Sequence, residues 1–311
     1  TAWTRSYDDD EPTPWLPAAA WPTAPVVRRS PCGTLTQLAR LELPEDRAFV
    51  LAARSMADGS VLVVAAPDRR TTPELLRLRA TPQPDGRSVW SLASLATLPL
   101  SQTQWARGGE DAWVVGTSSV GTSSTSELWR LDARAQVMSR EALPMHADRV
   151  DVAGDGQFVL SGRDVWHRRG TGTWASLERP TLPDVPGPLM VVATGAAEAW
   201  VLFPAGPTVV HYVDAMPRAV WPVAMEGERV SGLFVHPELG PLVLGFSGRA
   251  FAVEGWPSPA REPTWRPLSG GAPGLFASAV LPFPGGLWLG GADGTLAELH
   301  AGFGRCAEQP Q

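Results

Sequence analysis

The chain has 311 residues, a formal net charge of −6 at pH 7 and an isoelectric point near 5.4. This acidic balance disfavours nucleic-acid binding, which depends largely on Lys and Arg side chains that neutralise phosphates. No run approaches the roughly 18 apolar residues of a membrane-spanning helix, and no apolar signal-peptide core is present. We therefore expect no nucleic acid and no membrane span; because the chain starts at Thr1, a removed leader or a lipid anchor stays an alternative.

Residues 1–31 form an N-terminal arm that is rich in Pro and Trp. No apolar periodicity predicts a strand or a helix there. In a free arm Trp3, Trp15 and Trp21 would be exposed to water, which is unfavourable for such large apolar side chains. We predict an extended arm whose Trp side chains pack on the side of the folded domain or on a partner subunit.

Six short apolar runs recur along the rest of the chain, with 42 to 51 residues between successive starts. The third residue of each run is large and apolar. Most runs follow a hairpin-type turn such as Asp58-Gly59. A self-similar period of about 40 to 50 residues is typical of a β-propeller. The runs are residues 60–65 (SVLVVA), 111–116 (DAWVVG), 156–161 (GQFVLS), 198–203 (EAWVLF), 240–245 (GPLVLG) and 286–291 (GLWLGG).

The repeat predicts an all-β fold, a six-bladed β-propeller with four-stranded antiparallel blades, as one domain over residues 32–311. Each run would be the second strand of a blade. An alternating third strand would follow, and then a fourth strand that carries Trp or ends in Leu-Pro. The predicted blades span residues 47–100, 101–146, 147–185, 187–225, 228–270 and 274–306, the last completed by residues 33–44.

The last blade has no fourth strand of its own at the C-terminal end. Residues 33–44 end in the same Leu-Pro as other fourth strands, so we predict that this N-terminal strand completes the blade and closes the ring. Cys32 and Cys306 would then meet, and we predict a disulfide between them. A disulfide favours export to the periplasm, the outer surface or the extracellular space; two free thiols in a reducing cytosol are the alternative.

Residues 111–117 with 127–132, and residues 286–296, resemble the L-W-x-G-x-x-x-G-x-L repeats of bacterial propeller sensor and surface proteins. The resemblance implies the architecture of residues 33–306 and no particular activity. Two enzymatic six-bladed families fit poorly. A sialidase Asp-box would require Asp where Arg169 stands, and the calcium site of lactonase-like hydrolases uses Asn, which this chain lacks.

In a propeller, the loops between second and third strands share one face with the loops between blades, and ligands usually bind there. The longest such loops are residues 66–73, which contain Arg69 and Arg70, and residues 116–126, which are nearly all Gly, Ser and Thr. The second is predicted either as a flexible solvated insertion or as a hydroxyl-rich contact surface. Its candidate contact residues are Ser118, Ser119, Ser123 and Ser124.

Three predicted inter-blade loops carry an acidic residue followed by Arg, at positions 46–47, 148–149 and 228–229. These pairs either ring the channel mouth and bind a carboxylate or phosphate, or pair with one another between blades. His146 lies in one of these loops, whereas the other four His stand singly, so no metal site is predicted. The candidate ligand-binding residues at the mouth are Arg47, His146, Asp148, Arg149, Glu228 and Arg229.

The sequence favours a non-enzymatic exported propeller that binds a protein or a glycan, or that serves as a subunit of an envelope or extracellular assembly. No nucleophile elbow or phosphate-binding loop is present, and we predict no cofactor. The alternative is a hydrolase or lyase that acts on a saccharide or small ester at the channel mouth, using His146, Asp148 and the three arginines Arg47, Arg149 and Arg229. The candidate partner-binding residues are Trp3, Trp15, Trp21, Arg69, Arg70, Ser118, Ser119, Ser123 and Ser124.

Overall fold

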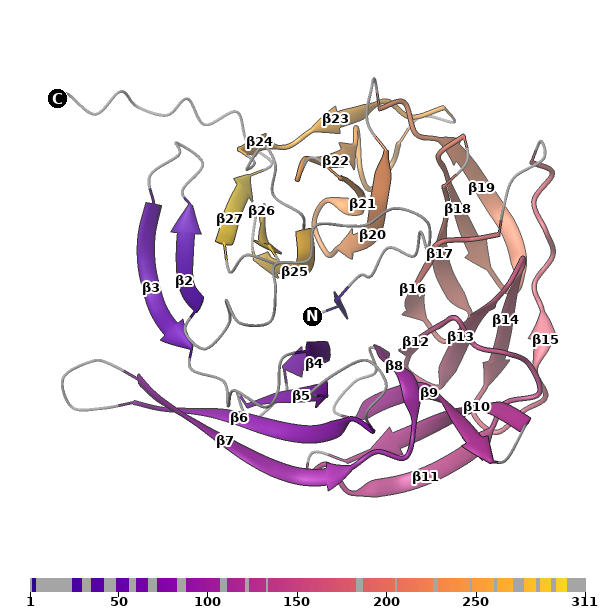
Figure 1. Ribbon diagram of the computed structural model, residues 1–311. Coiled ribbons are helices and arrows are strands. Elements are labelled where there is room, and N and C mark those ends of the chain that lie inside the picture. The colour runs from indigo at the N-terminus through magenta and orange to yellow at the C-terminus, as the bar shows by residue number, and fades with distance from the viewer. Residues whose placement is uncertain are drawn as a thin grey trace, which may run out of the picture.

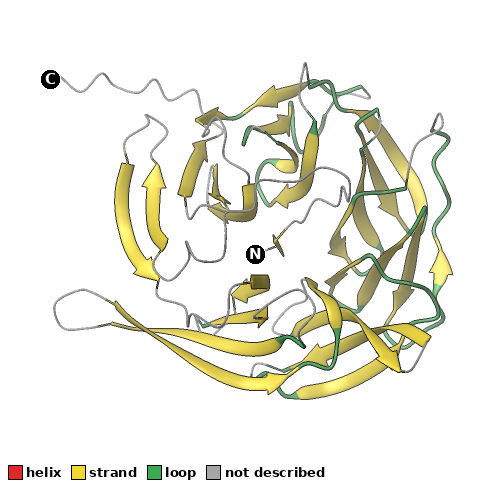
Figure 2. Cartoon of the chain, in the orientation of Figure 1, coloured by secondary structure: helices red, strands yellow, loops and turns green. Residues whose placement is uncertain are grey.

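The computed structural model shows β-strands arranged around a common centre (Figure 1). In the described part of the chain the strands are joined by turns and loops, with no helix (Figure 2) and hence none that could cross a membrane. The structure describes residues 2–3, 24–29, 35–41, 49–55, 60–66, 72–82, 88–106, 111–120, 123–132, 134–182, 187–204, 206–225, 229–246, 248–259, 262–270, 277–283, 286–291 and 295–300.

Five sheets are four-stranded and antiparallel, and each is built from consecutive strands. The first contains β4 (Phe49–Ser55), β5 (Val61–Ala66), β6 (Glu74–Pro82) and β7 (Ser88–Thr97). The second contains β8 (Ser101–Ala106), β9 (Ala112–Val120), β10 (Ser123–Leu131) and β11 (Val137–Ala142). The third contains β12 (Arg149–Ala153), β13 (Gly156–Ser161), β14 (Asp164–Arg169) and β15 (Ala175–Ser176). The fourth contains β16 (Met190–Gly195), β17 (Glu198–Phe203), β18 (Thr208–Val213) and β19 (Met216–Pro222). The fifth contains β20 (Val230–His236), β21 (Gly240–Gly245), β22 (Ala250–Val253) and β23 (Trp265–Pro267).

The remaining sheet has seven strands and joins the two ends of the chain. Its order is β1-β25-β26-β27-β2-β3, and β24 also pairs with β27. The strands are β1 (Ala2–Trp3), β2 (Ala24–Arg29), β3 (Leu35–Leu41), β24 (Ser269–Gly270), β25 (Ala277–Phe283), β26 (Gly286–Gly291) and β27 (Thr295–His300).

Five of the six apolar runs are confirmed as second strands of four-stranded sheets, β5, β9, β13, β17 and β21; the sixth run is β26, which lies between β25 and β27 in the seven-stranded sheet. The prediction for the N-terminal segment is corrected. β3, within residues 33–44, is not next to β27; β2 lies between them and pairs with β27 in parallel, with Val27 opposite Thr295. The arm therefore supplies strands β1 and β2, although it shows no alternating pattern. β2 contains Pro25 and only a short β-branched pair, so its strand conformation depends on pairing with its neighbours.

The core lies between neighbouring sheets. Strand β21 is buried at every residue, whereas the outer strand β19 alternates between exposed and less exposed positions. A second strand that is apolar on both faces must be covered on both sides. Clusters of buried side chains meet this need by joining one sheet to the next; the largest contains Trp200 and Trp221 from the fourth sheet and Trp265 from the fifth.

Hydrogen bonds between sheets follow the same period as the sequence. The Asp151 carboxylate accepts from the Ala193 amide at 2.9 Å, and the Trp265 indole donates to the Pro222 carbonyl at 2.9 Å. The partners are 42 and 43 residues apart. The third sheet is thus tied to the fourth, and the fourth to the fifth, by a polar contact as well as by apolar packing.

One close approach between the third and fourth sheets requires a glycine. Gly156 opens β13, and a Cβ atom there would overlap the backbone of Ala196 in the turn of the next sheet. From the same sheet, His167 Nε2 donates to the Ala196 carbonyl at 2.8 Å. The missing side chain at Gly156 allows this turn to sit against β13.

We expect Gly156→Ala to lower the free energy of unfolding by about 1–3 kcal/mol, because the added methyl displaces a packed backbone. Urea-induced unfolding measures this loss. Gly195→Ala is the matched control, since its Cβ would meet only the Glu198 side chain, at 3.4 Å, and we expect a change within about 0.5 kcal/mol. Equal effects of the two substitutions would contradict the close-packing explanation.

Candidate functional site

The structure describes about half of the residues that the sequence predicted for a site. His146, Asp148, Arg149, Arg229, Ser118 and Ser124 are described with their side chains, whereas Trp3, Ser119 and Ser123 are described only as parts of strands. Several predicted residues lie outside the described residues: Arg47, Glu228, Arg69, Arg70, Trp15, Trp21, Cys32 and Cys306.

The hydroxyl-rich segment 116–126 was predicted as a loop, and the structure corrects this. β9 extends to Val120 and β10 starts at Ser123, so the two strands pair as a long hairpin in which Ser118 lies opposite Thr125. The Ser118 side chain is buried and donates to Glu127 at 2.6 Å. Backbone pairing across the hairpin keeps this segment in strands despite its low apolar content. Ser118 is buried and is not part of an exposed contact surface, whereas Ser124 is exposed.

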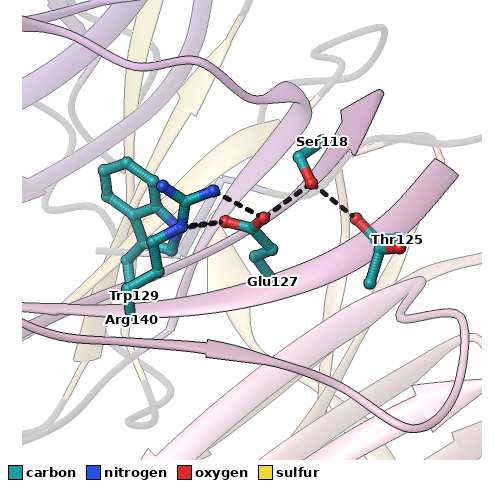
Figure 3. A network of polar contacts seen from close by, with 5 residues as sticks. All are labelled: Ser118, Thr125, Glu127, Trp129 and Arg140. Atoms are coloured by element: carbon teal, nitrogen blue, oxygen red, sulfur yellow. Dashed lines mark hydrogen bonds and ion pairs between the residues drawn. The ribbon is translucent and has the colours of Figure 1, made fainter. Parts of the chain in front are cut away.

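Glu127 is the centre of a buried polar network in the second sheet (Figure 3). Its carboxylate accepts from Ser118, from the Trp129 indole at 2.8 Å and from two nitrogens of Arg140 at 2.6 and 2.8 Å. The Arg140 guanidinium also lies 5.1 Å from the centre of the Trp129 ring. The hydrogen bonds from Arg140, aided by those from Ser118 and Trp129, lower the pKa of Glu127 to about 2, although burial opposes the shift. Because these donors surround both carboxylate oxygens, we interpret this network as structural.

We expect Glu127→Gln to destabilise the fold by about 2 kcal/mol at pH 7, since hydrogen bonds to an ionised group are lost. A pKa near 2 in the folded state lies below the ordinary value of 4.5. The stabilisation is therefore complete above about pH 4.5 and is lost as the pH falls toward 2. Denaturant unfolding of both proteins from pH 7 to pH 2.5 tests this, and a pH-independent difference would refute it.

The control for this prediction is Asp111→Asn. Asp111 also accepts from an arginine, Arg130 Nε, at 2.7 Å, but both side chains of this pair are partly exposed. Exposed ion pairs contribute at most about 1 kcal/mol. We expect a correspondingly small change.

His146 and Asp148 are brought together, as their spacing suggested. His146 Nε2 lies 3.4 Å from Asp148 Oδ1, and His146 Nδ1 lies 3.4 Å from Ser126 Oγ. However, Ser126 is buried and its Oγ accepts from the Ala147 amide at 2.9 Å, while the second Asp148 oxygen accepts from the Gly162 amide. These backbone hydrogen bonds use Ser126 and Asp148 to hold the loop between the second and third sheets.

Arg149 and Arg229 are the two arginines of the predicted channel-mouth set that the structure describes. Arg149 opens β12 opposite Leu160, and Arg229 lies with its guanidinium 5.7 Å from the centre of the Phe246 ring in the same part of the chain. Asp148, from the same set, contacts His146 and accepts a hydrogen bond from the Gly162 amide.

A recess between the fourth and fifth sheets was not predicted. It has a volume of about 330 Å³. Its lining includes Thr194, Glu198, Trp200, Val235, His236 and Trp256. These residues flank the turns between first and second strands, or follow the third strand β22. The recess therefore lies at the opposite end of the sheets from the loops where the sequence placed a site.

Aromatic stacking organises the wall of this recess. Trp200 and His211 are opposite each other on β17 and β18, and their rings stack with centroids 4.0 Å apart and planes 6° apart. The His211 Nε2 lies 2.8 Å from Glu198 Oε1. Trp256 stands edge-on to Trp200, with ring centroids 5.9 Å apart. The stack fixes His211, and His211 in turn fixes one oxygen of the carboxylate.

The stack beside the recess has a counterpart in the third sheet. In the third sheet His167 stacks on Phe158, opposite it on the neighbouring strand, and reaches the backbone of the next sheet. His211 stacks on Trp200 in the same way, but it contacts Glu198 of its own sheet. At His211 a hydrogen bond to Glu198 of the same sheet thus takes the place of the link to the next sheet seen for His167.

Gly240 and His236 shape the far side of the recess. Gly240 has a φ of 72°, and a Cβ there would overlap the Trp256 indole, so the glycine lets the ring lie against the turn. His236 Nδ1 accepts from the amides of Glu238 and Leu239, at 3.0 and 3.2 Å. These two hydrogen bonds fix the orientation of the His236 ring at the turn.

No protein-family model matches the chain, and no curated protein matches it. Among solved structures it is similar to a catalytically inactive virginiamycin B lyase from Staphylococcus aureus with quinupristin, at 12% identity and a TM-score of 0.58, over 90% of this chain and 96% of that one. A streptogramin B lyase gives 9% identity and a TM-score of 0.56 over 96% of each chain. BBS1N in complex with ARL6DN gives 11% identity and a TM-score of 0.52, over 85% of this chain and 80% of that chain. These likenesses show that the fold is a β-propeller, and at such identities they show the fold alone.

Proposed function

We propose that this chain is a non-enzymatic binding propeller that recognises a protein or a glycan, or serves as a subunit of an envelope or extracellular assembly. The recess between the fourth and fifth sheets carries the proposal, because it combines aromatic rings with one partly exposed carboxylate. Ligand sites are typically concave and mostly apolar, with a few placed polar groups. The propeller in BBS1N, which was solved in a complex with ARL6DN, is consistent with a protein partner.

The proposal includes a closed ring of six blades. Five four-stranded sheets and the seven-stranded sheet would each be one blade, with β2 and β3 supplementing β25, β26 and β27. Strand β1 pairs with β25 and contacts β4 of the first sheet. This N-terminal strand would latch the last blade to the first, as in propellers that close with both ends of the chain in one sheet.

Export is part of the proposal and rests on the predicted disulfide. β2 and β27 are parallel, so both strands lead out at the same end of the sheet. In the sequence Cys32 follows β2 by three residues and Cys306 follows β27 by six. A bond between them would persist in an oxidising compartment. Intact mass of the native protein, alkylated with and without prior reduction, tests it.

The test of the binding function is gentle isolation of the tagged full chain from its native extract, followed by mass spectrometry of what accompanies it. We expect one or more partners in constant ratio to the chain and absent from a mock isolation without tag. A strictly monomeric protein that carries neither protein nor glycan would contradict the proposal.

The alternative function, a hydrolase or lyase, is favoured by one observation: an exposed His146 in contact with Asp148 and Ser126. A general acid or base typically contributes 10²- to 10⁴-fold to a rate. For a binding propeller we expect the parent protein to turn over a panel of esters and polysaccharides only at the background rate, and His146→Ala to leave that rate unchanged. A loss of 100-fold or more in turnover would establish the enzyme instead.

A further inference from the structure

We infer that the recess between the fourth and fifth sheets binds an organic cation, a guanidinium or alkylammonium group on an apolar stem. The inference rests on the proposed binding function and specifies its ligand chemistry. It is argued from the charge, the aromatic rings and the size of the recess, all formed by residues that the structure describes.

The charge of the recess is negative. Among its described lining residues Glu198 is the one acidic side chain, and none is Lys or Arg. The Glu198 side chain is 43% exposed. One of its oxygens is near His211 Nε2, and within the described residues no hydrogen bond to the other oxygen is found. Glu127 offers the contrast, since donors contact both of its oxygens. Glu198 therefore retains accepting capacity for a charged N–H donor.

The aromatic and apolar walls suit the rest of such a ligand. A cation near an indole is attracted by the ring quadrupole, most strongly for Trp, and Trp200 and Trp256 both line the recess. Val235 and Pro237 provide apolar surface for a methylene stem. A saccharide would need several polar partners for its hydroxyl groups, and the lining offers few besides Thr194 and Glu198.

The size of the recess limits the ligand. A volume of about 330 Å³ lies at the lower end of the range for small-molecule sites, roughly 300–1,000 Å³. This accommodates one arginine or lysine side chain of a partner, or a small free amine, but not a folded segment. A guanidinium or ammonium head group is common to both of these ligands, the partner side chain and the free amine.

Titration calorimetry of the full chain tests the inference with butylguanidinium and butyltrimethylammonium as probes, and with butanol and butyrate as neutral and anionic counterparts. We expect the two cations to bind and the counterparts not to bind. Glu198→Gln removes the charge at constant shape and should weaken cation binding at least 10-fold. Binding of butanol or butyrate as strong as that of the cations would overturn the inference.

Glu254→Gln is the matched control. Glu254 has the same side-chain exposure, 43%, and is also in an ion pair, with Arg266 at 2.6 Å, but it does not line the recess. We expect this variant to bind the cations like the parent, and both variants to show unchanged thermal unfolding. Equal losses in the two variants would mean a general charge effect and would refute the site.

Two further experiments distinguish a protein partner from a small amine as the source of the cation. They also distinguish failure of this site from failure of the binding function. An arginine-containing peptide that binds more tightly than its citrulline analogue, and more tightly than the free amines, assigns the recess to a protein partner; the reverse order assigns it to a small amine. A disaccharide that binds where the cations do not overturns the cation inference. If no cation binds but partners still accompany the native chain, the binding function stands and this site does not.

Discussion

The structure depends on one constraint: a strand with apolar residues on both faces of its sheet is buried only when neighbouring sheets cover both faces. Strand β21 is buried along its whole length, which no single sheet could achieve. The core is consequently a series of interfaces between neighbours, and hydrogen bonds such as those of Asp151 and Trp265 join one repeat to the next. Stability is shared among these interfaces, as expected for repeat architectures.

A site can form in such a series wherever one interface departs from the others. His167 and His211 occupy matching places, each stacked on the aromatic residue opposite it. His167 connects its sheet to the following one, whereas His211 is held by Glu198 within its own sheet. The recess and its carboxylate lie beside this altered contact, where Trp256 packs against Gly240.

Two glutamates show how the same residue type can have a structural role in one place and the proposed ligand-binding role in another. Glu127 is buried, and its donors hold the second, third and fourth strands of the second sheet together. Its charge is compensated inside the protein, which is the condition under which a buried carboxylate is tolerated. Glu198 is partly exposed and receives a single hydrogen bond in the described structure. The number of donors around each carboxylate, rather than its sequence context, separates the two roles.

The sequence by itself determined the repeat, because strand periodicity and apolar runs are local properties: four of the six second strands, among them β13 and β17, have the predicted bounds. His146 and Asp148, which the sequence placed in one loop, are in contact. Only the tertiary structure decided that β2 lies between β27 and β3, and that Glu198, Trp200 and Trp256 surround a recess. The pairing of Phe158 with His167 and of Trp200 with His211 in successive repeats was a visible signal. Trp256 had none, because it reaches the site from a loop, and contacts between sheets depend on packing that no local pattern records.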